Sequence, residues 1–434
     1  MSEKRVEQIK VLDARKTISR IILVSAIILV TVFGWFAIRW QLGNMLAELT
    51  LPTAPNSQNV ARLAVNFAPS DPMSNWLVAS TNRDIFTSEK ISASLSEYER
   101  VVQLAPNDFR WWIELARARE QAEDITGAEK AYLRAVEIAP NYIYPHWQFG
   151  NFYLRQGRSD EAFAELKKAA ENNSTYRHQV FSLAWEYYEQ DTAKIEQLAE
   201  DSPAVRAALA MFYAGRSRAK DSLRIWNTLP DESKQENFAI GKVIERALFE
   251  KRNYGEAIEF TRQLGTEPDA KPEFIQNGSF EQPIGESKDS FFGWVVSSLE
   301  KVDTKIDPTQ KREGNRSVRV SFNGYSDPTF FTLLQYVVIK PSAKYHLSFW
   351  LRTENMKSGG TPTLEIYNAN DDKIIAVSKP FPNGKTDWQQ VKIEFMAPEN
   401  AEAIGIRTTR AYCGLECPIF GTFWYDDFKL EKIK

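Results

Sequence analysis

The sequence predicts a multidomain chain in which a single N-terminal transmembrane helix is followed by an all-α repeat domain and an all-β sandwich. An uncharged apolar stretch at residues 21–38 predicts the transmembrane helix. A pattern that recurs every 34 residues predicts the repeat domain. A change from helical spacing to strict alternation after Leu264 predicts the sandwich. At 434 residues the chain has room for about three domains.

The apolar stretch is long enough to cross a membrane. As a helix it would span about 27 Å, which matches a slightly thin hydrocarbon core. Trp35 and Trp40 lie at one end, where aromatic residues gather in membrane proteins. A cleaved signal peptide is the alternative, but the sequence after the stretch, Arg39-Trp40-Gln41, offers no small-residue cleavage site. We therefore expect residues 21–40 to be a membrane anchor.

Basic residues are distributed unevenly around this stretch. Residues 1–20 contain six Lys and Arg, whereas residues 39–62 contain two. The positive-inside rule then leaves residues 1–20 in the cytoplasm and the rest of the chain, beyond about residue 41, in the periplasm of a bacterial inner membrane. Residues 41–74 contain four prolines together with Asn and Ser, a composition that predicts a tether, with a short helix at Asn59–Phe67 as a further expectation.

Residues 75–264 carry the repeat. Pro106 and Pro140 are 34 residues apart, and Tyr98, Tyr132 and Leu166 share that spacing. Small residues recur at the same period, as at Val101, Ala135 and Ala169. The pattern resembles the tetratricopeptide repeat, in which small residues let two antiparallel helices touch. The resemblance implies an α-solenoid of about five helical pairs, with the repeat decaying after Ser174.

In that family the first helix of each pair lines a concave face, and the resemblance implies a groove that holds a partner's peptide or helix. The candidate groove residues are Arg110, Ile113, Arg117, Glu120, Tyr144, Trp147, Asn151 and Arg155. The alternative is a solvated inner face that acts only as a spacer. Aromatic and Arg side chains together favour a protein-binding groove.

The sequence changes character at residues 265–272, where Gly265, Pro268 and Pro272 predict a linker. In residues 273–434 apolar and polar side chains alternate, as in residues 345–352, and Asn-Gly and Gly-Gly pairs punctuate the segments. About eight such strands with no helical stretch predict a β-sandwich.

Short motifs at both ends of this region resemble the jelly-roll carbohydrate-binding modules of families four and nine. They are Asn277-Gly278-Ser279-Phe280-Glu281 at the start and Trp424-Tyr425-Asp426-Asp427 at the end. In that family a structural calcium ion often ties the first and last strands together. The resemblance therefore implies Asn277, Glu281, Asp426 and Asp427 as calcium ligands. The alternative is that the Asp pair simply ends a strand.

Sugar binding needs aromatic rings beside hydrogen-bonding side chains. His346, Trp350 and Arg352 alternate with apolar residues and share one side of their predicted strand, and Arg407 on a neighbouring strand could join them. These four residues are the glycan-binding candidates. The alternative is that Trp350 is covered by a loop or by the helical domain.

Cys413 and Cys417 are the two cysteines of the chain. Three residues separate them, so in an oxidising compartment they are expected to form a disulfide that pins their own loop. The spacing does not match a Cys-x-x-Cys redox centre, and no thioredoxin-like βαβ pattern surrounds it.

The sequence carries no catalytic constellation. It has no nucleophile elbow, phosphate-binding glycine loop or zinc-protease motif, and three His with two Cys provide no transition-metal cluster. The net charge of −3 gives no field that would favour nucleic acid. The arrangement resembles the membrane-anchored repeat proteins of bacterial exopolysaccharide systems.

Three functions stay open at this point. The first is a scaffold, not an enzyme, that binds a protein partner and a polysaccharide in surface polysaccharide assembly or export. The second is a pure protein scaffold with a non-binding sandwich. The third is an unrecognised polysaccharide-modifying enzyme.

Overall fold

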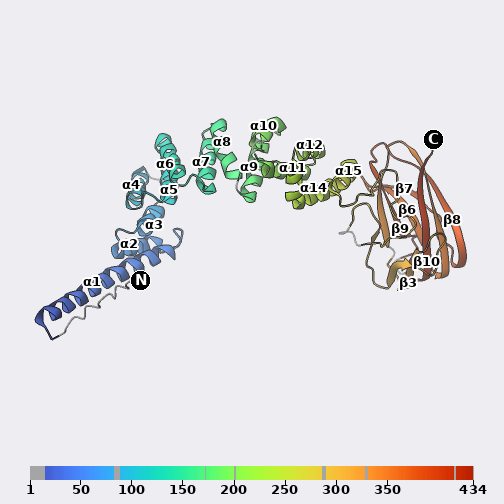
Figure 1. Ribbon diagram of the computed structural model, residues 1–434, viewed down its shortest axis with the longest axis horizontal. Coiled ribbons are helices and arrows are strands. Elements are labelled where there is room, and N and C mark those ends of the chain that lie inside the picture. The colour runs from blue at the N-terminus through green and yellow to red at the C-terminus, as the bar shows by residue number, and fades with distance from the viewer. Residues whose placement is uncertain are drawn as a thin grey trace, which may run out of the picture. The chain divides into compact units, whose positions relative to one another are not determined.

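The computed structural model describes residues 15–433 except 83–87, 172, 200–201, 286–289, 328–330 and 415–416 (Figure 1). Its contacts divide the chain into two compact units, Met1–Val180 and Phe181–Lys434. The first unit holds helices α1 to α8. The second holds helices α10 to α15 and a β-sandwich, and α9 spans the boundary between the units.

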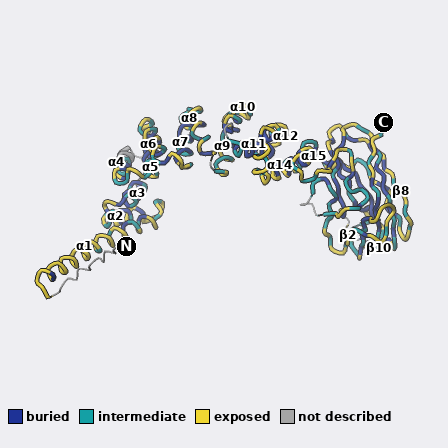
Figure 2. The backbone as a smooth tube through the Cα atoms, viewed as in Figure 1, coloured by how far each residue is buried: buried dark blue, intermediate teal, exposed yellow. Residues whose placement is uncertain are grey.

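Helix α1 (Thr17–Glu48) extends beyond the predicted residues 21–40 at both ends. Within the described residues it is the helix that is long and apolar enough to cross a membrane. Its side chains stay exposed along most of its length (Figure 2). This agrees with the predicted N-terminal apolar helix.

The segment after the apolar stretch differs from the expected tether. Helices α2 (Ser57–Phe67) and α3 (Pro72–Asn82) pack on the end of α1. Small residues make this contact close, because a Cβ atom at Gly43 would lie 2.5 Å from the Cβ of Ala68. Residues 41–74 are therefore largely helical and packed, since the alanines of α2 outweigh the four prolines, which all lie outside its interior.

Paired helices follow, as the repeat predicts. Contacts are most extensive between α5 and α6, between α7 and α8, and between α3 and α4, followed by those between α11 and α12. The helices are α4 (Ser88–Leu104), α5 (Phe109–Gln121), α6 (Ile125–Ile138), α7 (Ile143–Arg155), α8 (Ser159–Glu171), α9 (Ser174–Tyr187), α10 (Thr192–Glu196), α11 (Pro203–Gly215), α12 (Ala219–Asn227), α13 (Asp231–Glu236), α14 (Phe238–Glu250) and α15 (Tyr254–Leu264).

The 34-residue positions form the core of these pairs. Tyr98, Tyr132 and Leu166 are all fully buried. Gly150 is needed because a Cβ atom there would stand 2.7 Å from Cγ of Leu166. Asp108 caps α5 by accepting a hydrogen bond from the backbone N–H of Arg110. The predicted tetratricopeptide-like solenoid is thus confirmed as a series of packed helical pairs.

The C-terminal region is a sandwich of two antiparallel five-stranded sheets within the described residues. Sheet A has the order β1-β4-β9-β6-β7, and sheet B has the order β2-β3-β10-β5-β8. The strands are β1 (Val295–Val296), β2 (Val302–Asp307), β3 (Ser317–Tyr325), β4 (Leu333–Val338), β5 (Lys344–Lys357), β6 (Pro362–Asn368), β7 (Ile374–Val377), β8 (Gly384–Met396), β9 (Ala403–Arg410) and β10 (Ile419–Ile433).

Alternation along the strands builds the core between the sheets. Leu347, Phe349 and Leu351 of β5 point inward and meet Ile404 and Ile406 of β9 in one buried cluster. The polar residues between them face outward on each sheet. The predicted β-sandwich is therefore confirmed, with ten described strands where about eight were expected.

Candidate functional site

The predicted groove residues lie on α5 and α7, and one of them is not available to a partner. Ile113 is 1% exposed and belongs to the core beneath α5. The helical period turns this position inward, because Ile113 lies about one turn from the buried Ala116.

The other groove candidates largely bind one another. Arg117 donates to the Tyr144 hydroxyl at 2.9 Å, which links α5 to α7. Arg155 donates twice to the Glu120 carboxylate, at 2.7 and 2.8 Å, and makes a second link between the same helices. These contacts fix the spacing of adjacent helical pairs.

The remaining groove candidates, Trp147, Asn151 and Arg110, also have partners within the chain. Asn151 donates to the carbonyl of Trp147, and the Trp147 ring meets the Tyr176 ring edge-on. Arg110 pairs with Asp108 yet keeps two thirds of its side chain exposed. Tyr142, which the sequence did not single out, is exposed nearby and contacts Phe109. In this region a partner could therefore reach the exposed side chains of Arg110, Tyr142 and Tyr144 and the half-exposed side chain of Arg155.

On the sandwich, three of the four glycan candidates share the outer face of sheet B. His346, Trp350 and Arg352 all point outward from β5. The Arg312 guanidinium lies 4.4 Å from the centre of the Trp350 ring, so a neighbouring loop covers part of this ring. Arg352 pairs with Asp387 at 3.3 Å. The rings and cations on this face already have partners within the chain.

Arg407 does not join them, because β9 belongs to sheet A. Strand β10 lies next to β5 in sheet B, whereas β9 lies between β4 and β6. Period-2 alternation places Arg407 outward, but it does not tell which of two sheets a strand enters. The expectation that these four residues form one site is therefore corrected.

Around Arg407 the outer face of sheet A has its own organisation. Arg407 Nε donates to Glu365 Oε1 at 2.7 Å, and its guanidinium lies 4.5 Å from the centre of the Tyr367 ring. Gly405 makes room for that ring, because a Cβ atom there would stand 2.2 Å from Tyr367 Cζ. Although they point outward, Glu365 and Tyr367 are only 7% and 4% exposed, whereas the Arg407 side chain is 32% exposed.

The last helical pair covers one end of this face. Tyr254 of α15 stacks on Tyr336 of β4 with ring centres 5.8 Å apart, and its hydroxyl donates to the carbonyl of Ala369. Phe249 of α14 also contacts Tyr336, and Arg252 pairs with Asp372. Figure 1 shows β6, β7 and β9 on the side of the sandwich next to α15. The covered rings continue toward Arg407, because the Tyr336 and Tyr367 ring centres are 6.3 Å apart and Arg407 lies over the Tyr367 ring.

The predicted calcium ligands do not come together as a metal site. Two of them hold one loop through its backbone: Glu281 accepts from the N–H of Asn315 at 2.7 Å, and Asp426 accepts from the N–H of Arg312 at 2.8 Å. The Asn315 N–H lowers the pKa of Glu281 below its usual value.

The other two predicted ligands have local partners. Asn277 binds the backbone of Gln282, and Asp427 pairs with Lys429. Donors rather than further oxygens surround these carboxylates. No cluster of three His, Cys, Asp or Glu side chains in the described residues is arranged to hold a metal. The side chains as arranged therefore do not fit a calcium site.

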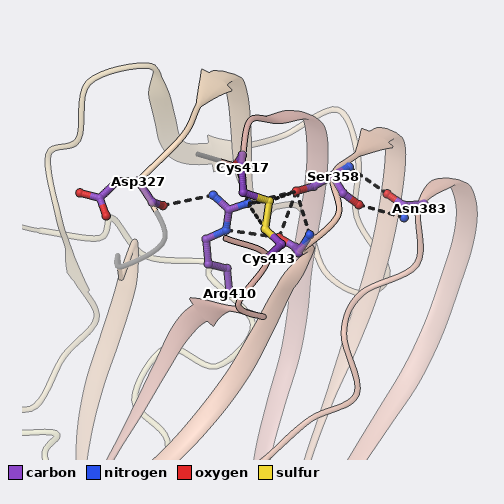
Figure 3. Close-up of a disulfide and its surroundings, with 7 residues drawn as sticks. Asp327, Ser358, Asn383, Arg410, Cys413 and Cys417 are labelled. Carbon is purple, nitrogen blue, oxygen red and sulfur yellow. Dashed lines mark hydrogen bonds between the residues drawn. A yellow bond between two sulfur atoms is a disulfide. The ribbon is translucent and has the colours of Figure 1, made fainter. Parts of the chain in front are cut away.

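The predicted disulfide is present. Cys413 and Cys417 are bonded to each other in the loop between β9 and β10. Arg410 at the end of β9 contacts both sulfurs, and Figure 3 shows its guanidinium between the disulfide, Ser358 and Asp327. No sequence pattern indicated a role for Arg410, because an arginine at a strand end is ordinarily solvated.

Together these features define a protein made of an α-helical repeat solenoid and a jelly-roll-like β-sandwich. Residues 110–142 match the family model of the tetratricopeptide repeat, and residues 272–409 match that of a carbohydrate binding domain, CBM_4_9. Both predicted resemblances are thereby confirmed. No curated protein matches the chain.

Solved structures with similarity to the chain include carbohydrate-binding modules and a tetratricopeptide-repeat protein. A CBM4 structure is 18% identical, with 37% of this chain and 99% of that chain covered and a TM-score of 0.28. TmCBM61 in complex with β-1,4-galactotriose is 19% identical, with coverages of 38% and 100% and a TM-score of 0.25. MamA is 12% identical, with coverages of 41% and 87% and a TM-score of 0.23.

Proposed function

We propose that this protein is a membrane-anchored periplasmic scaffold that serves the assembly or export of a surface polysaccharide. Its helical repeats bind a protein partner, its sandwich binds the polysaccharide, and it catalyses no reaction. The tetratricopeptide match indicates protein interaction, and the carbohydrate-binding match indicates glycan recognition. The observation that carries the proposal is the Arg407–Glu365 pair over Tyr367 on the outer face of sheet A.

The chemistry of this pair suits a sugar. Sugar hydroxyls take paired hydrogen bonds from planar groups, and a guanidinium offers several donors in a fixed fork. Glu365 and the Tyr367 ring hold the Arg407 fork in place, so little side-chain entropy is lost when a ligand binds. The outer face of sheet B is a weaker candidate for the glycan site. The outward residues of its edge strand β8 are exposed, as is usual for residues that face solvent.

The protein partner would meet α5 and α7. Arg110, Tyr142 and Tyr144 are exposed there beside an internally paired framework. Aromatic and Arg side chains are the types that most often anchor protein interfaces. Helix α1 would hold both binding domains at the membrane.

Affinity electrophoresis of the full chain in detergent, through gels containing purified bacterial surface polysaccharides, tests the glycan site. Arg407→Ala should abolish retention, because it removes the exposed donor fork. Arg352→Ala is the matched control. Arg352 is also paired with an acid and lies 5.8 Å from the centre of the Trp424 ring, but it belongs to sheet B. It should leave retention unchanged.

The other outcomes separate the alternatives. Loss of retention in Arg352→Ala and Trp350→Ala alone would move the site to sheet B. If no polysaccharide retards the parent protein, the pure protein scaffold is favoured. The stacking of Tyr254 on Tyr336 also favours that alternative, because this contact occupies an aromatic ring of the candidate face. Shortened or modified glycan after incubation would reveal an enzyme.

A further inference from the structure

A buried cation touches both sulfurs of the disulfide. Arg410 is 7% exposed, and its Nη2 atom lies 3.1 Å from Cys417 Sγ and 3.4 Å from Cys413 Sγ (Figure 3). The same nitrogen donates to the carbonyl of Cys417 at 2.7 Å and to Ser358 Oγ at 3.0 Å. The rest of the guanidinium donates to the carbonyls of Gly360 and Asp327.

Among the described residues, the acceptors of these hydrogen bonds are carbonyl and hydroxyl oxygens and, while the sulfurs are oxidised, a neutral disulfide. Carbonyl and hydroxyl oxygens and a neutral disulfide are weak partners for a buried guanidinium. Burial accordingly lowers the pKa of Arg410, against the opposing effects of Tyr325 and Asp327. Reduction of the disulfide would place an anion, the thiolate of Cys417 or Cys413, directly beside this cation.

We infer that Cys413–Cys417 is a reducible disulfide and a site of thiol–disulfide exchange with a dithiol partner protein. A neighbouring arginine lowers the pKa of a cysteine, and stabilising the reduced form makes a disulfide easier to reduce.

The exchange proceeds in two steps. A partner thiolate attacks Cys413 Sγ, the more exposed of the two sulfurs, since Cys413 is half-buried and Cys417 is 5% exposed. The bond between the sulfurs breaks, Cys417 leaves as a thiolate beside Arg410, and Cys413 is joined to the partner. The second partner thiol loses its proton and attacks the partner's sulfur in this mixed disulfide. Cys413 leaves as a thiolate and takes up a proton, so two electrons have passed to this chain and the partner is oxidised.

Reduction would loosen a junction of three loops. Arg410 joins the cysteine loop to Ser358 and Gly360 and to the segment at Asp327. Ser358 and Asn383 in turn exchange hydrogen bonds between their backbone and amide groups, so the junction extends to the loop before β8 (Figure 3). The redox state of the pair would therefore set the order of the loops at this end of the sandwich.

Two measurements on the full chain test the inference. In the reduced protein, the pH dependence of iodoacetamide alkylation, read by mass spectrometry, should give Cys417 a pKa well below the ordinary value of about 8.5. In glutathione redox buffers, Arg410→Met should make the disulfide about tenfold harder to reduce, which corresponds to about 30 mV. Arg410→Lys, which keeps the charge on a different geometry, should shift the equilibrium less than Arg410→Met.

Asn383→Ala is the matched control, because it removes the hydrogen bonds between Asn383 and the backbone of Ser358 and keeps the cation at the sulfurs. It should leave the redox equilibrium unchanged. A Cys417 pKa at or above 8.5, or an Arg410→Met protein whose disulfide is as easily reduced as the parent's, would overturn the inference. If Arg410→Met does not fold, the alkylation pKa of the parent decides.

Discussion

The hydrogen bonds of His146 depend both on its position in the repeat and on its protonation state. Its Nδ1 atom faces Glu165 and its Nε2 atom faces the carbonyl of Pro140. Both neighbours have acceptor oxygens, and both ring nitrogens can donate to them only when the imidazole is protonated. Burial alone would lower the pKa of His146, but the hydrogen bonds to Glu165 and to the carbonyl of Pro140, together with the charge of Glu165, outweigh it and the pKa is raised. Trp112, 34 residues earlier, likewise donates to the carbonyl of Pro106.

His146→Gln should destabilise the α7–α8 pair in a pH-dependent way. Because the folded pKa of His146 is raised, its stabilising effect is complete below about pH 6.5 and is lost as the pH rises through the folded pKa. The pKa of Glu165 is lowered, so on the acid side the effect is lost as the pH falls through that value. We expect a loss of about 1–2 kcal/mol at pH 6 and less at pH 9, measured by hydrogen exchange of α7 and α8.

Lys168→Ala is the control for this comparison. Lys168 also pairs with Glu165, but it is half exposed, so its removal should cost less than about 0.5 kcal/mol. An equal loss at pH 6 and pH 9 for His146→Gln would show that the imidazole is neutral in the folded protein.

The burial of single residues could be predicted from the sequence where they occupy equivalent positions of the 34-residue repeat. Tyr98, Tyr132 and Leu166 are buried as their 34-residue spacing required. Arg410 and Glu365 could not be predicted, because their roles depend on contacts across strands that are distant in the chain. Ile113 was placed in the groove by analogy, although its apolar side chain fits the core better.

At the scale of elements, the packing of α1 on α2 rests on one glycine. Gly43→Val would drive a side chain into Ala68 and into the carbonyl of Ala64. We expect the α1–α2–α3 contact to open, with a cost of at least about 1–3 kcal/mol for overpacking. Limited proteolysis of the full chain should then cut within residues 49–71.

Gly34→Val is the matched control in the same helix. A Cβ atom at Gly34 meets nothing within 4 Å, so this change should leave the protease pattern unaltered. Identical patterns for both variants would contradict the role assigned to Gly43.

The loop held by Glu281 and Asp426 yields a prediction about calcium. Because backbone N–H groups already surround these carboxylates, thermal unfolding of the full chain should show the same Tm in EDTA and in calcium. Glu281→Gln should lower the Tm equally in both conditions, since the N–H groups of Asn315 and Arg316 lose a charged acceptor. A calcium-dependent rise in Tm that Glu281→Gln abolishes would restore the calcium ligands inferred from the sequence.

Helices and strands were largely predictable because their periods are local. Within the tether at residues 41–74 only a short helix at Asn59–Phe67 was predicted, which agrees with α2. The packing of this segment on α1 was not predicted, since four prolines dominate its composition and all lie at helix ends or in turns. The sheet assignment of β9 was not predictable either. Alternation tells which side chains face inward, but the choice between two sheets depends on pairing across the whole sandwich.

At the scale of the whole molecule, the orientation of the chain across a membrane can be tested directly. Six basic residues precede the apolar stretch and two follow it, so the C-terminus should lie in the periplasm. Alkaline phosphatase fused after Lys434 should be active. An inactive phosphatase together with an active cytoplasmic reporter would contradict the predicted orientation. The disulfide would then lie outside the oxidising compartment that it requires.

The continuity of α1 has a mechanical consequence. One helix runs from the apolar stretch to Glu48 and is locked to α2 and α3 at Gly43 and by the hydrogen bond from Arg39 to the carbonyl of Asn66. A flexible linker would not transmit movement of a membrane anchor to the following domain, whereas a continuous helix would transmit it. Rotation or tilting of the anchor would therefore turn the first helices by the same angle. Lipid thickness, or another helix pressed against the anchor, could in this way steer where the repeats present their binding face.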